Sequence, residues 1–86
     1  MRARRSKDQV IVEILNMCEK GENLTGIVYR TNTSFAGIKA YLTVLIKNDL
    51  LICQDASPRI YKATPKGLEI RDSLEKLHKV MEGLKI

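Results

Sequence analysis

Apolar residues recur with the spacing of an amphipathic helix in three stretches of the first half of the chain. The stretches cover residues 8–20, 24–30 and 34–48, and we expect a helix in each. Ser6 precedes the first stretch and Ser34 opens the third, and both are suited to cap a helix. The side chains that we expect to face the core are Val10, Ile11, Ile14, Leu15, Cys18, Ile27, Val28, Phe35, Ile38, Tyr41, Leu42, Leu45 and Ile46. Tyr29 is expected to be at least half-buried.

The pattern changes after the third helix. Two short apolar runs, residues 50–54 and 59–63, flank Asp55-Ala56-Ser57-Pro58, a segment of turn-forming residues. This combination predicts a β-hairpin. Three helices, a hairpin and a last helix, in this order, form a winged helix-turn-helix. In that arrangement the third helix is placed to enter the major groove of DNA, and the hairpin is the wing.

The last helix carries an apolar seam of its own. A cap at Thr64 followed by Pro65 predicts that the helix starts there and runs nearly to Ile86, with Leu68 packing back on the domain. The residues that recur with heptad spacing are Ile70, Leu74, Leu77, Met81 and Leu84. Because so small a domain has little to cover this seam, we expect it to join two copies in a coiled coil. An antiparallel pairing is favoured over a parallel one, but the sequence does not decide between them. The alternative is that the helix folds back to complete the intramolecular core.

Basic residues are concentrated at the start of the chain, which has 86 residues and a net charge of +5. The bases that precede the first acidic residue are Arg2, Arg4, Arg5 and Lys7. A basic arm ahead of a nearly neutral domain indicates a polyanionic partner, with a solubilising tail as the alternative. We therefore divide the chain into an arm (1–7), a winged-helix domain (8–64) and a dimerisation helix (65–86). The expected fold class is mainly α with a small β-hairpin.

Composition and motifs exclude several classes of function. No apolar run approaches the roughly 20 residues that cross a bilayer, and no signal peptide follows the basic start. We therefore expect a cytoplasmic, nucleoid-associated protein that binds no membrane. Cys18, Cys53 and one histidine are too few for a structural zinc site, and we expect both thiols to be buried. Since no catalytic constellation or glycine-rich phosphate loop is recognisable, we expect neither an enzyme nor a cofactor.

Candidate DNA contacts follow from the positions of polar side chains in the expected elements. Outside the arm they are Arg30, Thr33, Ser34, Lys39, Thr43, Arg59 and Lys62. Lysine, arginine, serine and threonine donate to phosphates, and some reach base edges. Ser34 serves equally as a helix cap, and Arg30 equally complements the dipole of the second helix. We expect Arg59 to make the contact from the wing, ahead of Lys62.

Four stretches also carry a family resemblance: Arg4-Arg5-Ser6, the run from Tyr29 to Phe35, Lys39-Ala40-Tyr41-Leu42, and Tyr61-Lys62-Ala63-Thr64-Pro65-Lys66-Gly67. They resemble archaeal winged-helix transcription regulators and small DNA-binding proteins over about residues 4–70. The resemblance implies a DNA-binding function. Similar members include chromatin-type proteins that dimerise through a C-terminal antiparallel coiled coil. One departure is that Gly37 and Ala40 stand where members often carry Gln and Lys, so side chains that would read base edges are missing.

The sequence thus supports three hypotheses. The first is a homodimer that binds double-stranded DNA, as a transcription regulator or a chromatin-type protein, through the third helix, the wing and the arm. The second is a winged-helix module that binds another protein. It is favoured by the few charges on the third helix and opposed by the basic arm. The third is an RNA-binding protein, for which the sequence offers no platform for single strands.

Overall fold

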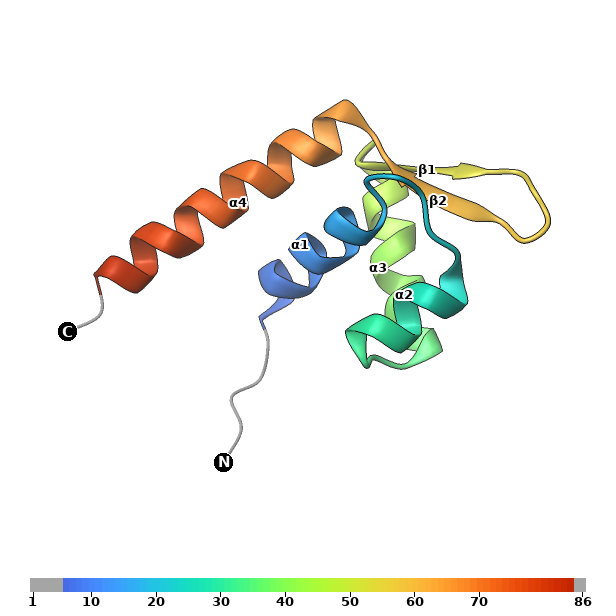
Figure 1. Ribbon diagram of the computed structural model, residues 1–86, viewed down its shortest axis with the longest axis horizontal. Coiled ribbons are helices and arrows are strands. Elements are labelled where there is room, and N and C mark those ends of the chain that lie inside the picture. Colours follow the sequence, from blue (N-terminus) through green and yellow to red (C-terminus); the bar gives the residue numbers. More distant parts are fainter. Residues whose placement is uncertain (1–5, 85–86) are drawn as a thin grey trace.

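Side-chain caps fix where the helices begin in the computed structural model, which describes residues 6–84. Ser6 and Gln9 form a reciprocal capping box at the first helix. Asn23, Ser34 and Thr64 each accept a hydrogen bond from the backbone N–H three residues further on, at 2.8, 3.0 and 2.9 Å. The elements are α1 (Lys7–Met17), α2 (Leu24–Thr31), α3 (Phe35–Lys47), β1 (Leu51–Gln54), β2 (Ile60–Ala63) and α4 (Pro65–Gly83) (Figure 1).

This order confirms the predicted fold, which is mainly α with one small hairpin. The ends of two helices differ from the prediction. α1 ends at Met17 rather than near Lys20, and the chain then turns through Gly21, whose φ of 103° is left-handed. α4 ends at Gly83, and its predicted continuation to Ile86 lies outside the described residues.

The core lies between the first three helices and the hairpin. Its fully buried apolar side chains are Ile14, Leu15, Cys18, Ile27, Ile38, Leu45 and Leu51. All except Leu51 were assigned to the core from helical spacing, and this assignment is confirmed. The one buried polar side chain among the described residues is Thr31, whose hydroxyl donates to the carbonyl of Ile27 at 2.7 Å. That bond satisfies a group that would otherwise be costly to bury.

Several large side chains lie outside the core, contrary to the prediction. Phe35 is 52% exposed, Ile46 is 38% exposed and Tyr29 is 85% exposed. Phe35 and Ile46 lie on a flank of α3, beside its buried side chains. Helical spacing does not show how much of the helix surface the neighbouring elements cover. Val12 was not assigned to the core, yet it is buried on the side of α1 that meets α4.

The wing is a two-stranded antiparallel hairpin that is tied to the helices at its base. β1 and β2 pair from Leu51 opposite Ala63 to Gln54 opposite Ile60. Two further backbone bonds join Glu22 to Tyr61, from Glu22 N–H to the Tyr61 carbonyl (3.0 Å) and from Tyr61 N–H to the Glu22 carbonyl (2.8 Å). The segment before α2 therefore forms one isolated bridge to β2, which ties the wing to the helices.

The two cysteines have different environments. Cys18 is buried, whereas Cys53 lies exposed on β1, so the prediction for Cys53 is wrong. Cys53 is on the same face of the strand as Leu51, but it lies two residues further out, where the hairpin has left the core. Burial, and to a smaller extent the charge of Glu22, raises the pKa of the Cys18 thiol from 9.0 to about 12.

We expect iodoacetamide to alkylate only Cys53 in the folded protein at mildly alkaline pH, because the thiolate is the reacting form. Mass spectrometry should count one adduct in buffer and two in denaturant.

The pKa of Cys18 is higher in the folded state than in the unfolded state. Stability should therefore decline as the pH rises from about 9 towards about 12. Equal alkylation rates for Cys18 and Cys53 in the folded protein would contradict the buried, high-pKa thiol on which both predictions rest.

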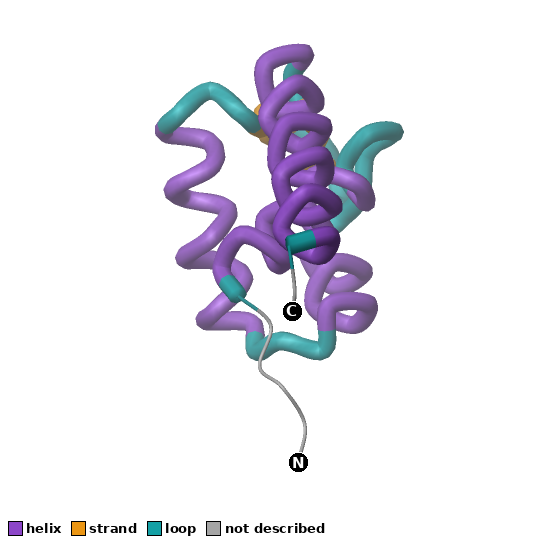
Figure 2. Tube along the Cα trace, turned by 90° about the vertical axis from the view of Figure 1, so that its left-hand side faces the viewer, coloured by secondary structure: helices purple, strands orange, loops and turns teal. Residues whose placement is uncertain are grey.

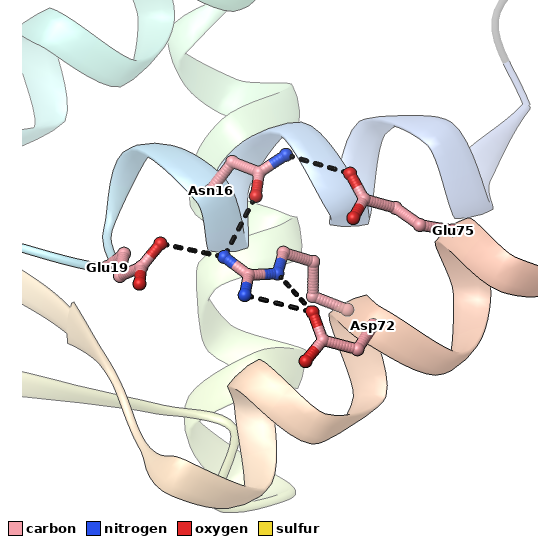
Figure 3. Close-up of polar contacts among 5 residues, drawn as sticks. Asn16, Glu19, Asp72 and Glu75 are labelled. Carbon is pink, nitrogen blue, oxygen red and sulfur yellow. Dashed lines mark hydrogen bonds and ion pairs between the residues drawn. The ribbon is translucent and has the colours of Figure 1, made fainter.

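A polar network holds α4 against α1. Arg71 Nη1 donates to Asn16 Oδ1 (3.0 Å) and to Glu19 Oε1 (2.8 Å), and Asn16 Nδ2 donates to Glu75 Oε2 (3.4 Å) (Figure 3). Hydrogen bonds to Glu19 and Asp72 raise the pKa of Arg71 above its ordinary value. α4 thus turns a polar side towards α1.

Four of the five residues of the apolar seam of α4 are exposed. The exposed fractions of Ile70, Leu77, Met81 and Leu84 are 37%, 51%, 58% and 64%, and Leu74 is half-buried. Figure 2 shows α4 in front of the other helices, on the outside of the molecule. Leu68 packs on the core as predicted, but the seam beyond it is not part of the core. No helix within residues 6–84 is both long and apolar enough to span a membrane.

Candidate nucleic-acid interface

The outer surface of α3 is exposed and basic. The helix buries Ile38, Leu42 and Leu45 and leaves Lys39 and Lys47 in solvent. Its sequence contains no aspartate or glutamate. A helix of ordinary diameter fits the major groove of B-DNA, and in helix-turn-helix proteins its N-terminal residues meet the base edges.

The hydroxyl groups assigned to DNA contacts already make local hydrogen bonds. Thr43 Oγ1 donates to the carbonyl of Lys39 at 2.9 Å, and Thr33 Oγ1 donates to the carbonyl of Thr31 at 3.2 Å. Ser34 Oγ accepts from Gly37 N–H as the cap of α3. The bonds of Thr33 and Ser34 position the turn between α2 and α3. All three bonds reduce the hydrogen-bonding capacity that these hydroxyl groups have left for a ligand.

A cleft of about 520 Å³ lies between α3, the start of α2 and the wing. Lys39 reaches it from α3, and Arg59 reaches it from the wing. The other described residues that line it are Asn23, Leu24, Thr25, Pro58 and Tyr61, none of them acidic. Two cations beside a cleft without a carboxylate are suited to an anion such as a backbone phosphate.

The remaining predicted contacts are not gathered at this cleft. Arg30 pairs with Glu22 at 3.3 Å, and its side chain is 59% exposed. Lys62 follows Tyr61 on β2, so it points to the opposite face of the hairpin. Lys7 lies on the other flank of α3, where it lines a shallow apolar pocket with Gly37 and neighbouring residues of α3.

Three arginines of the arm, Arg2, Arg4 and Arg5, lie outside the described residues. The arm nevertheless joins the domain at Lys7, next to α3. Sequence reasoning missed Asn23 and Thr25 at the start of α2. The signal was present, because an asparagine directly before an apolar helical stretch is a common cap.

The fold is that of a winged helix-turn-helix protein. Residues 4–82 match the family model described as winged helix-turn-helix, and the chain belongs to that family. This confirms the family resemblance of the sequence. Among curated proteins, none matches the chain.

The solved structures that are similar to this chain include the following two. The first is Sso10a-2, a DNA-binding protein from Sulfolobus solfataricus, at 27% identity and a TM-score of 0.87, over 93% of this chain and 85% of that one. The second is the adhesin competence repressor AdcR from Streptococcus pyogenes, at 19% identity and a TM-score of 0.69. That match covers 94% of this chain and 63% of AdcR, and at this identity it shows the fold alone.

Proposed function

We propose that this chain is a double-stranded DNA-binding protein that acts at the nucleoid as a homodimer, either as a transcription regulator or as a chromatin-type protein. The observation that carries the proposal is the cleft that Lys39 of α3 and Arg59 of the wing both line, with no acidic residue in its lining. The likeness to a DNA-binding protein from Sulfolobus solfataricus supports it. In this arrangement α3 enters the major groove, and the wing and the arm hold phosphates.

The homodimer is supported by the outward seam of α4. Ile70, Leu77, Met81 and Leu84 are each more than a third exposed, and they follow heptad spacing over a helix of 19 residues. A stripe of this kind is costly in water and is a common mark of association. Two copies joined along α4 would present two α3 helices and two arms to one duplex.

A fluorescence-anisotropy titration of random-sequence duplex DNA at several salt concentrations tests the proposal. We expect log K to fall linearly with log salt, because bound phosphates release counterions. The double variant Lys39→Ala/Arg59→Ala should bind more weakly and reduce the slope by about one for each phosphate that the variant no longer binds. Changing Arg2, Arg4 and Arg5 to alanine measures, in the same assay, how much the arm contributes to DNA affinity and to the salt slope.

The matched control is Lys76→Ala/Lys79→Ala, which removes the same charge from α4. It should leave the slope close to that of the unchanged protein. Equal slopes for the two double variants would show that net charge, rather than the cleft, supplies the contact. Absence of binding at low salt would overturn the proposal and favour the alternative, a module that binds another protein.

A further inference from the structure

Four exposed residues form one row along the outer surface of α3. Phe35, Lys39, Thr43 and Lys47 follow each other at intervals of four, so their side chains are neighbours on the helix. Along the row, two residues with an apolar group, the Phe35 ring and the Thr43 methyl, alternate with two lysines. It begins at the first residue of α3, the end that meets base edges in helix-turn-helix proteins.

Packing in the core does not account for the two apolar groups of this row, the ring of Phe35 and the methyl of Thr43. Phe35 is 52% exposed although it is the only phenylalanine of the chain. Thr43 donates its hydroxyl to the carbonyl of Lys39, one turn back. Its hydroxyl is therefore directed along the helix, and its methyl group is the part that remains for a ligand.

Few polar side chains are left in the first turns of α3 to read bases. Ala36 and Ala40, beside the row, have no polar side-chain atoms, and Ser34 is used as the cap. Among the exposed residues of 35–43, Lys39 is the one with a long polar side chain, and it also reaches the cleft beside the wing. In the first turns of α3, Lys39 is thus the main exposed side chain that can read base edges by hydrogen bonds.

The major groove offers one apolar group to such a surface, the C5 methyl of thymine, which phenylalanine and the threonine methyl contact favourably. We infer that Phe35 and Thr43 bind thymine methyl groups and give the protein a preference for A·T-containing sites. This inference rests on the proposed function, since it requires α3 to lie in the groove. The two lysines of the row fit the same occupant, because they carry the charge that phosphates attract.

A methyl-deletion experiment tests the inference with DNA itself. The two probes are a duplex of alternating A·T pairs and the same duplex with deoxyuridine in place of thymidine. The change removes only the C5 methyl and keeps the base pairing and every phosphate. We expect the uracil duplex to bind more weakly, by about fourfold for each methyl that the protein buries. The ratio of the two affinities is the quantity to compare among variants.

Two variants test which residues are responsible for the ratio of the two affinities. Phe35→Ala should lower the ratio. Thr43→Ser should also lower it, and this variant keeps the hydroxyl that bonds to Lys39, so its fold is preserved. Tyr29→Ala is the matched control, because Tyr29 is an exposed aromatic residue on α2 and should leave the ratio unchanged. Thermal unfolding of each variant monitors the fold.

The outcomes separate the inference from the proposed function. Equal affinity for the two duplexes overturns the inference and leaves DNA binding intact. A preference for thymine that survives in both Phe35→Ala and Thr43→Ser also overturns the assignment to these residues. Failure of the unchanged protein to bind either duplex at low salt overturns the proposed function itself.

Discussion

Replacing Leu77 by aspartate is expected to convert the proposed homodimer into monomers. Leu77 lies in the middle of the seam of α4 and is 51% exposed in the single chain, so the substitution leaves the protomer folded. In a coiled coil it would bury a carboxylate from each copy without a partner, at a cost of about 3–5 kcal/mol. Sedimentation equilibrium should give the mass of two 9.8 kDa chains for the unchanged protein and of one for Leu77→Asp.

Loss of the dimer should also weaken DNA binding. A monomer presents one α3 and one arm, so its salt slope should be about half that of the dimer. The matched control is Lys76→Asp, because Lys76 is exposed on α4 next to Leu77 in sequence but lies outside the heptad positions. It should remain dimeric. A monomeric unchanged protein at micromolar concentration, or a dimeric Leu77→Asp variant, would contradict the seam as the interface.

The second large effect is expected at Gly67, in the first turn of α4. A Cβ there would collide with the carbonyl oxygen of Leu50, which is backbone and has little room to move. Thr64 holds this contact in place, because its N–H donates to Leu50 O (3.1 Å) and its hydroxyl donates to Asp49 O (2.7 Å). Gly67→Ala must therefore move α4 away from the end of α3 or distort the turn between α3 and β1.

We expect Gly67→Ala to lower the free energy of unfolding by about 3 kcal/mol, which is roughly 15 °C in Tm for a domain of this size. Gly83→Ala is the control, since a Cβ at Gly83 meets no atom of the described residues within 4 Å. That change should be neutral or stabilise the helix by up to about 0.5 kcal/mol. Thermal unfolding followed by circular dichroism measures both, and equal Tm values for the two variants would contradict the steric argument.

The interior was predictable because helical and strand periods differ, and because caps act on residues close in sequence. Ser6, Ser34 and Thr64 bond to N–H groups three residues away, so no distant part of the chain is needed to define these helix starts. Phe35 was misassigned for the opposite reason. Its spacing places it beside the buried side chains of α3, but its exposure depends on how far the neighbouring elements extend over the helix.

The candidate site was also predictable from the sequence only in part. Lys39 and Arg59 were selected from their positions on a helix and a wing, and the structure shows that they line one cleft. Arg30 was selected by the same reasoning, yet it pairs with Glu22. The sequence does not reveal which of two nearby charged groups an arginine will meet, because that depends on how α2 lies against the segment before it.

The order of the elements, three of the four helix caps, most of the core and the heptad spacing of α4 follow from the sequence alone, since each is a local pattern of polarity. Contacts between distant segments settle which face of each element is covered. Arg71 holds α4 against α1, and four of the five seam residues are left exposed. Phe35 on α3 is also left about half exposed. The reason is that burial depends on contacts between segments far apart in the chain, and periodicity fixes which residues share a face but not what that face meets.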